Sequence, residues 1–363
     1  MKYNAKIINS EVQIFLGAGA SKCLGKWLMI EFIDNLFSQL DKDERKILDT
    51  IIEYKEKDLE IVLQELNSLI DKSYLSDLKK INGLMDLIDS SGELARLHTF
   101  VESQHRGTNN YGFTPPEIAK LFNSLIKKCN DIKIKIENLI FEHYGEVNSD
   151  LVVELYVPIF DFLKKQYGLF TVPVFTTNYD NVIEKLNESG KYKIIDGFET
   201  QQTKKFIWKR KAFDNFKPKK NNINIPLFKL HGSVTWYEKN GEILYLEIPF
   251  NSRKNKNVNN VLVFPTQNKI CIEDPFYSAY EYFHRCIDKS KLLIVIGYSF
   301  RDYDTLTKIK SSLDYNGNLK IIIFDAKAEK YKKEIFNNSS KVIPINSNFN
   351  FDSVKFLLEK IEI

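Results

Sequence analysis

Positions 12–21 read V-Q-I-F-L-G-A-G-A-S, a short apolar run that leads directly into a turn of small residues. A β-rich apolar run without regular polar alternation predicts a strand that is buried on both faces of a parallel sheet. The small residues after it let the chain turn tightly before a helix begins. Strand, small-residue turn and helix in this order indicate an α/β architecture.

Three more apolar runs of the same kind follow, at 172–176, 292–296 and 320–324. Each is followed within two residues by Gly, Asn, Asp or Ser and then by apolar residues at helical spacing. The repetition predicts an α/β fold with a Rossmann-like parallel sheet and helices on both faces. Sheets of this kind bind ligands at the carboxyl ends of their strands.

A long helical insertion is expected between the first two strands. Its apolar residues recur at helical spacing, as at Ile47, Ile51 and Tyr54, and Pro115 is placed to begin a further helix. We expect residues 1–40 and 166–363 to form the sheet domain. We expect residues 41–165 to form a helical subdomain that covers the ligand cleft.

One stretch of this insertion, V-E-S-Q-H-R-G-T-N, is too polar for a packed helix. It contains Glu102, His105 and Arg106, which are candidates for contact with a ligand in the cleft. Their role stays open at the level of sequence.

Residues 196–261 are expected to form an irregular basic insertion. The stretch from Lys204 to Lys220 interleaves lysines with Phe206, Trp208, Phe213 and Phe216. It can be a patch for nucleic acid or a protein partner. It can equally be a solvated loop whose aromatic side chains pack inward.

Composition sets further bounds on function. Across 363 residues, 52 basic side chains nearly balance 48 acidic ones, so the charge of +4 does not indicate a dedicated nucleic-acid binder. None of the four cysteines forms a C-x-x-C pair, which argues against a zinc ribbon or a disulfide framework. No apolar run is long enough to span a membrane, so we expect a soluble, cytoplasmic protein.

The turn after the first strand is a candidate phosphate site. Gly17, Ala18 and Gly19 would let backbone N–H groups approach a diphosphate, and Ser21 can cap the helix or donate to a phosphate oxygen. A tight turn that holds no ligand would need the same small residues.

The second and third motifs supply groups for chemistry. F-T-T-N-Y-D, at positions 175–180, offers the Asn178 amide to a ribose hydroxyl or a water, and Asp180 can cap the next helix. K-L-H-G-S contains His231, which can accept a proton near neutral pH. Each residue also has a purely structural interpretation, as a helix cap or a hydrogen-bonded core histidine.

The fourth motif, I-G-Y-S-F-R-D, ends the third predicted strand at positions 296–302. Gly297 allows close approach, Ser299 can donate to phosphate, and Arg301 can pair with an anion or with Asp302 at the surface. Asp325 ends the next strand, where acidic residues of dinucleotide-binding folds accept from ribose hydroxyls.

Taken in order, these four motifs resemble the bacterial sirtuin-like family, especially branches found in antiphage defence systems. The resemblance runs from Ile14 to about Asp325 and implies an NAD-binding domain. It implies that Asn178 and His231 form the catalytic pair and that Asp180 orders the site. It assigns the remaining cofactor-binding roles to Gly17, Ala18, Gly19, Ser21, Thr177, Gly297, Ser299 and Asp325.

Two departures from the deacylating sirtuins bear on the reaction. Those enzymes carry two close pairs of zinc-binding cysteines and a P-D-F-R segment, whereas this chain has neither and reads K-C-L-G-K-W-L-M-I-E-F after its glycine turn. We therefore expect an NAD hydrolase that needs no metal and releases nicotinamide and ADP-ribose, or a cyclic form of it. The resemblance implies an antiphage effector that depletes NAD when triggered.

Two other functions remain open. One is an NAD-dependent protein deacylase, and the other is a non-catalytic module that binds NAD, ADP-ribose or nucleic acid. The resemblance also implies a homo-oligomer and a separately encoded partner, such as a HerA-type ATPase or another trigger protein. No membrane partner is expected.

Overall fold

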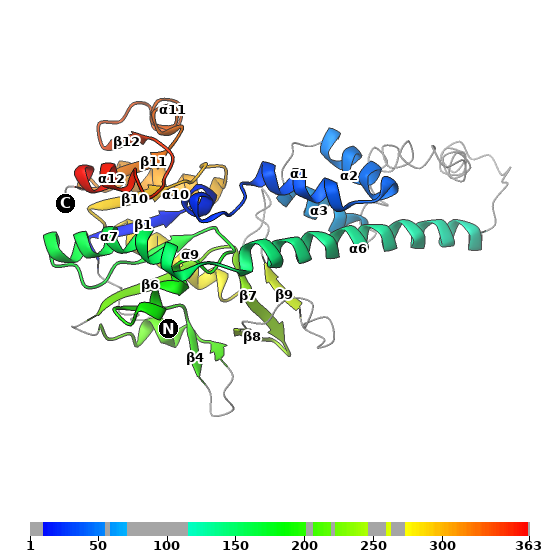
Figure 1. Ribbon diagram of the computed structural model, residues 1–363, viewed down its shortest axis with the longest axis horizontal. Coiled ribbons are helices and arrows are strands. Elements are labelled where there is room, and N and C mark those ends of the chain that lie inside the picture. Colours follow the sequence, from blue (N-terminus) through cyan, green and yellow to red (C-terminus); the bar gives the residue numbers. More distant parts are fainter. Residues whose placement is uncertain are drawn as a thin grey trace. The chain divides into compact units, whose positions relative to one another are not determined.

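The computed structural model describes residues 10–54, 59–70, 115–200, 206–218, 222–245, 259–262 and 273–361 (Figure 1). Contacts between residues divide the chain into two compact units: residues 1–28 with 140–363, and residues 29–139. The helical subdomain expected over 41–165 overlaps the second unit, but its expected ends differ from the ends of that unit. Glu102, His105 and Arg106 lie outside the described residues.

The first unit is built on a parallel sheet of seven strands in the order β12-β11-β10-β1-β2-β6-β3. This confirms the predicted fold class. The strands are β1 (Val12–Leu16), β2 (Val174–Thr176), β3 (Tyr192–Ile195), β6 (Ile223–Lys229), β10 (Leu292–Ile296), β11 (Lys320–Asp325) and β12 (Val342–Asn346). The sequence predicted β1, β10 and β11 within one residue and the end of β2 correctly, but it began β2 two residues too early and did not predict β3, β6 or β12.

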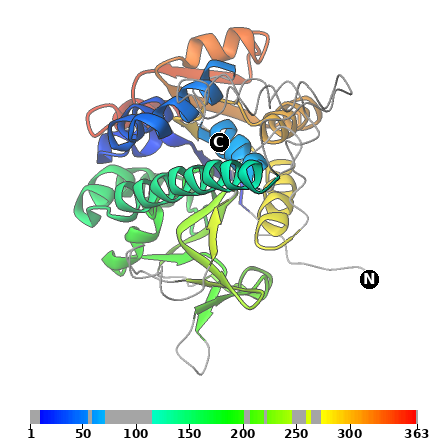
Figure 2. The ribbon, with the colours of Figure 1, turned by 90° about the vertical axis from the view of Figure 1, so that its right-hand side faces the viewer.

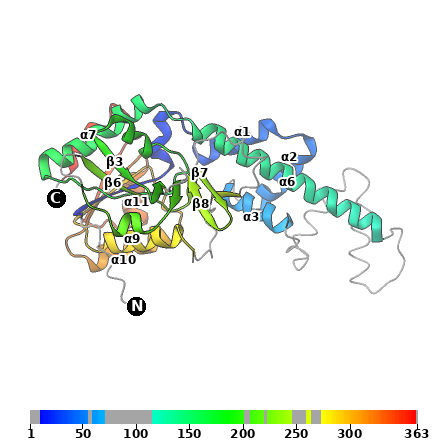
Figure 3. The same ribbon diagram turned by 90° about the horizontal axis from the view of Figure 1, so that it is seen from below.

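Helices cover both faces of this sheet because alternate residues of the strands point to opposite sides. On one face, Ile14 of β1 packs in a core with α7 (Ser149–Tyr167) and α12 (Val354–Lys360). On the other, Phe15 packs with α9 (Phe276–Ile287), α10 (Tyr303–Tyr315) and α11 (Ala328–Glu334). Figure 3 shows α7 and the pair α9 and α10 on opposite sides of the strands.

A second, antiparallel sheet belongs to the same unit and has the order β4-β5-β8-β7-β9. Figure 2 shows its strands, in green and yellow-green, extending away from the parallel sheet. The strands are β4 (Phe198–Thr200), β5 (Phe206–Trp208), β7 (Gly232–Lys239), β8 (Glu242–Tyr245) and β9 (Asn259–Leu262), and a short helix, α8 (Lys211–Asp214), follows β5.

The range 196–261 is therefore not an irregular insertion among its described residues, because it supplies this sheet and β6 of the parallel sheet. The turn between β7 and β8 shows why this range forms paired strands. Asn240 and Gly241 both have positive φ, at 55° and 76°, which is what a two-residue type I′ hairpin requires. The inward-packing interpretation holds for Trp208 and Phe213, which are both buried. Lys204, Lys205, Lys219 and Lys220 lie outside the described residues.

The described helices of residues 29–139 are α1 (Met29–Gln39), α2 (Lys42–Tyr54), α3 (Leu59–Ile70) and most of α6 (Pro115–Gly145). Helix α6 begins at Pro115, as the sequence predicts. Asp41 accepts from the N–H of Glu44 while Glu44 accepts from the N–H of Asp41, a capping box that starts α2. Lys135 neutralises the buried Glu44 carboxylate at 2.6 Å. No helix among the described residues is long and apolar enough to cross a membrane.

The first unit consists of two segments, residues 1–28 and residues 140–363, and the end of the first is bound to the start of the second. The Lys26 ammonium donates to the carbonyl oxygens of His143 and Glu146, and the Trp27 ring stacks on His143 with centroids 3.6 Å apart. The backbone N–H of Trp27 also donates to His143 Nε2 at 2.8 Å, and the Tyr144 hydroxyl donates to the backbone carbonyl of Trp27. The end of the first segment is thus fixed to the start of the second segment of this unit.

Candidate active site

The four sequence motifs follow four strands that are neighbours in the sheet. Leu16, the last residue of β1, is paired with Thr176 of β2 on one side and with Ile296 of β10 on the other. Thr176 is in turn paired with Lys229 of β6. Because all four strands are parallel, the residues that follow them emerge at the same edge of the sheet.

The turn after β1 packs directly against the loop after β10. Gly19 donates its N–H to the Gly297 carbonyl at 2.9 Å, and Gly17 donates to the carbonyl of Ile296 at 3.0 Å. A Cβ on Gly17 would lie 2.6 Å from the Gly297 oxygen, and Gly297 itself has a φ of +61°. The glycines are therefore needed for contact between two backbones, whether or not a ligand is bound.

This contact leaves Ala18 as the exposed member of the turn. The N–H groups of Gly17, Gly19 and Ala20 already donate to backbone carbonyls. Ala18 is the first residue of the short helix η1 (Ala18–Leu24), where helical geometry provides no acceptor for the N–H group. Ala18 is exposed, whereas Ser21 is only 2% exposed.

Asn178 fixes the loop after β2 to this turn. Its side-chain Nδ2 donates to the Gly17 carbonyl at 2.9 Å and to Ser21 Oγ at 3.2 Å. A carbonyl can only accept, so the amide nitrogen must face Gly17 and the amide oxygen, Oδ1, must face the other way. Asn178 is half-buried, and Oδ1 is the atom it has left to accept a hydrogen bond from a ligand.

Asp180 lies two residues further along and orders the same loop. Its Oδ1 accepts from the N–H of Val182, and its side chain is buried. The helix that follows, η4 (Ile183–Ser189), has Val182 and not Asp180 at its cap position. The predicted helix cap is therefore wrong, because Asp180 instead closes a turn that ends at Val182, the cap residue itself.

A buried lysine holds this loop through hydrogen bonds. Lys229, at the end of β6, is 1% exposed and donates to the Asp180 carbonyl and, at 2.8 Å, to Glu184 Oε1. A buried lysine is stable only with such partners, because an unpaired ammonium away from water is costly. Lys229 is not among the residues predicted from sequence, although it lies two positions before His231.

His231 follows β6 and lies next to the loop that carries Asn178. The Leu230 N–H donates to the Thr176 carbonyl at 2.8 Å and the Val234 N–H to the Tyr179 carbonyl at 3.0 Å, so backbone hydrogen bonds flank both residues. The histidine is 4% exposed. Its chain neighbours place it at the same strand-end edge as Asn178.

The partner of His231 is Asp302. His231 Nε2 lies 3.2 Å from Asp302 Oδ2, and the Tyr280 hydroxyl donates to that same oxygen at 3.2 Å. The contact between Asp302 and His231 is largely buried, with side chains 9% and 5% exposed. Burial raises the pKa of Asp302, but hydrogen bonds from His231, Thr305 and Tyr280 outweigh it and hold this pKa below its usual value.

The residues assigned to the adenosine half also lie at this edge. The Gly297 N–H donates to the carbonyl of Phe324, the residue before Asp325, and Ser299 is exposed. Asp325 accepts from the Lys327 N–H at 2.8 Å, and burial raises the pKa of its carboxyl group. Thr177 is half-buried, and its N–H donates to the Leu16 carbonyl.

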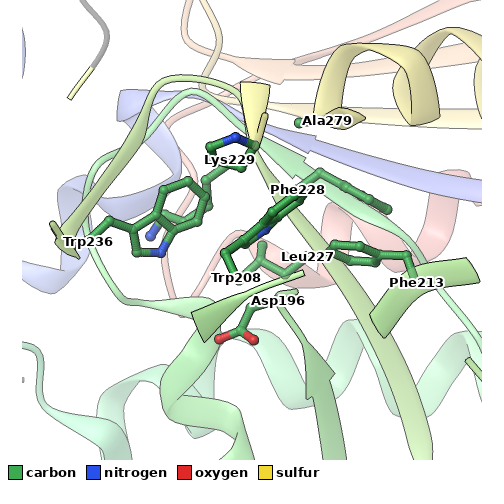
Figure 4. A pocket seen from close by; sticks show the side chains of 9 residues that line it. Asp196, Trp208, Phe213, Leu227, Phe228, Lys229, Trp236 and Ala279 are labelled. Atoms are coloured by element: carbon green, nitrogen blue, oxygen red, sulfur yellow. The ribbon is translucent and has the colours of Figure 1, made fainter. Parts of the chain in front are cut away.

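A small cavity elsewhere in the unit has an aromatic wall (Figure 4). Its lining residues are Asp196, Trp208, Phe213, Leu227, Phe228, Lys229, Trp236, Pro275 and Ala279. Burial raises the pKa of the Asp196 carboxyl group to about 6. None of the residues predicted to bind NAD or to react with it lines this cavity.

The basic stretch is described in part, and there Lys209, Lys211 and Lys217 are exposed. Arg210 is paired with Glu281 at 2.7 Å and with Asp214, and its guanidinium lies over the Tyr282 ring.

Among the residues that the structure describes, no group of three or more His, Cys, Asp or Glu side chains is arranged to hold a metal ion.

The part of the chain that carries Asn178, His231 and Asp302 can be compared with known families. Residues 172–345 match the SIR2-like domain family. The SIR2-like region thus begins just before β2 and ends within β12, and it confirms the sirtuin-like resemblance over that range. The turn at Gly17 to Ser21 precedes it in the chain.

Two solved structures also align with nearly the whole chain, each at 10% sequence identity. The one described as "The Structural basis of Sirtuin Substrate Affinity" covers 96% of this chain and 94% of its own, with a TM-score of 0.43. The other, a complex of a mutant Sir2 homologue with ADP-ribose, covers 97% of this chain and 94% of its own, with a TM-score of 0.41. No curated protein sequence matches the chain.

Proposed function

We propose that this protein is an NAD glycohydrolase that breaks the bond between nicotinamide and ribose. The observation that carries the proposal is the meeting, at one edge of a SIR2-like sheet, of a glycine turn, the Asn178 amide and a buried histidine paired with a carboxylate. These are the groups needed to hold a dinucleotide and to move a proton.

In the proposed complex, the diphosphate of NAD lies at the turn after β1. Ala18 is the exposed residue of this turn and the first residue of η1, so its N–H makes the proposed contact. Ser21 accepts from Asn178 and supports the turn from within. Gly297, Ser299 and Asp325 are assigned to the adenosine half.

Departure of nicotinamide leaves positive charge on the ribose, as in glycoside cleavage. Asn178 Oδ1 accepts from a ribose hydroxyl or from the attacking water and so orients it. His231 accepts the proton that this hydroxyl or water gives up, and water adds to the ribose carbon that nicotinamide has left. The products are nicotinamide and ADP-ribose, or a cyclic form when a hydroxyl or an adenine nitrogen of the same molecule attacks in place of water.

The proposed biological role is that of an antiphage effector that depletes NAD when triggered. Because constant hydrolysis of NAD would harm the cell, activity is expected to depend on self-assembly, on a partner such as a HerA-type ATPase, or on another trigger. This part of the proposal rests on the family resemblance of the motifs.

The test is an assay of NAD loss and nicotinamide release by the full chain, alone and with candidate triggers. Loss of a general base typically lowers a rate by about 10²–10⁴-fold, so His231→Ala is expected to fall in that range. Asn178→Ala is expected to lose activity as well. Unchanged turnover in both variants, or transfer of an acyl group from lysine to ADP-ribose by the wild type, would contradict the proposal.

A further inference from the structure

We propose that Asp302 is a positioning residue that fixes His231 in one tautomer, with the proton on Nε2 and the lone pair on Nδ1. Tyr280 assists by holding the same carboxylate oxygen. The inference rests on the proposed function for its catalytic meaning, since it names Nδ1 as the atom that accepts the proton.

The two oxygens of Asp302 have separate tasks. Oδ1 accepts from the Thr305 N–H at 3.0 Å and so caps α10, while Oδ2 faces both His231 Nε2 and the Tyr280 hydroxyl at 3.2 Å. The cap places the carboxylate because it ties Asp302 to the first turn of a helix. Oδ2 is thereby held toward the histidine.

The protonation pattern follows from these partners. Hydrogen bonds from the Thr305 N–H and the Tyr280 hydroxyl favour the ionised form of Asp302, and an ionised carboxylate can only accept. Nε2 must then be the donor of the His231 contact. A neutral imidazole with its proton on Nε2 carries its lone pair on Nδ1.

Burial makes this arrangement effective. The side chains of His231 and Asp302 are 5% and 9% exposed, so water competes little for their hydrogen bond. When Nδ1 takes up a proton, the ring becomes positively charged, and the adjacent carboxylate stabilises that charge in a region of low dielectric. The three residues come from the end of β6, from α9 and from the start of α10, so the fold itself sets their geometry.

The first test is a two-bond ¹H–¹⁵N correlation spectrum of the full chain labelled at its histidine ring nitrogens. The chain has only five histidines, and His231→Gln identifies the signal in question. We expect the Nε2–H pattern in the wild type. In Asp302→Asn we expect the Nδ1–H pattern, because the new amide can donate to Nε2 while its oxygen still caps α10. An Nδ1–H wild type, or an unchanged pattern in the variant, overturns the inference.

The second test compares steady-state NAD hydrolysis by matched variants. Asp302→Asn is expected to lower kcat by about 10²-fold or more with little change in KM, because the lone pair would then be on the wrong nitrogen. Tyr280→Phe is expected to lower kcat less, by about 3–10-fold, through one hydrogen bond. Asp304→Asn removes an equal charge from the same helical turn and is expected to have wild-type kinetics.

The two tests separate this inference from the proposed function. A wild type that shows the Nε2–H pattern but consumes no NAD with any trigger contradicts the NAD hydrolase and leaves the tautomer assignment supported. A wild type that hydrolyses NAD, with Asp302→Asn equally active, supports the function and overturns the positioning role of Asp302.

Discussion

Asn178 donates its side-chain amide to the carbonyl oxygen of Gly17, 2.9 Å away and 161 positions earlier in the chain. One hydrogen bond thus joins the loop after β2 to the turn after β1. The residue proposed to orient the substrate also shapes the turn proposed to bind its diphosphate. Substitutions at this position are therefore expected to act on binding, reaction and stability together.

Asn178→Asp tests this link with an almost isosteric change. A carboxylate oxygen would face the Gly17 carbonyl in place of an N–H donor, so two acceptors would oppose each other. We expect loss of NAD hydrolysis and a fall in the free energy of unfolding of about 1–3 kcal/mol, measured by urea denaturation. Asn187→Asp, an exposed position on η4, is the control and is expected to change neither quantity.

Gly297→Ala tests the contact between the turn after β1 and the loop after β10. The added Cβ would lie 2.3 Å from the Ala20 nitrogen, and the backbone would have to keep a φ of +61°. We expect a loss of at least about 2 kcal/mol in the free energy of unfolding. Gly317→Ala has open space around its Cβ and should be nearly neutral. Equal stability of the two variants would contradict the described contact.

Ala18→Pro tests the proposed diphosphate contact without disturbing the fold. Proline has no N–H but is tolerated at the first position of a helix, and Gly17 before it is already extended, with a ψ of −174°. We expect NAD affinity, measured by calorimetry, to fall by about 10–100-fold at unchanged melting temperature. Ala18→Ser keeps the N–H and is the control. Full NAD affinity in Ala18→Pro would place the diphosphate elsewhere.

Asp196→Asn tests the effect of burial on a carboxyl group outside the site. Its pKa is raised from 3.8 to about 6, so the folded state binds a proton more tightly than the unfolded state. The Asp196 carboxyl group therefore favours the folded state most below pH 3.8. This contribution to the free energy of unfolding is lost as the pH rises towards about 6. Asparagine stays neutral and can keep the hydrogen bond from the Phe198 N–H.

The stability of Asp196→Asn relative to the wild type should accordingly increase by about 2 kcal/mol across that interval. Urea denaturation of both proteins on either side of the interval measures it. A difference that does not vary with pH would show that this carboxyl group titrates alike in the folded and unfolded states.

The sequence predicts the parts of the sheet whose strands are continuous apolar runs. β1, β10 and β11 are of this kind and were found within one residue of their observed ends. β6 and β12 contain Pro226 and Pro344, and proline lowers the expectation of a strand because it lacks an N–H donor. β12 accommodates its proline at the edge of the sheet, where no further strand needs that donor.

The site was predicted where it depends on motifs and missed where it depends on packing. Asn178 and His231 stand in recognisable segments that each follow a strand. The pairing of His231 with Asp302, 71 positions away, depends on how β6, α9 and α10 are placed. Tyr280 carries no local signal, because its role depends on the face that α9 turns towards the sheet.

The contacts of Lys26 and Trp27 with His143 have a consequence for how this protein can vary. The chain leaves the first unit and returns to it at neighbouring points that are fastened to each other. Residues 29–139 thus lie between two points of the chain that are bound to each other, while β1 and β2 pair directly. We therefore expect that another segment can replace residues 29–139 while the sheet is kept.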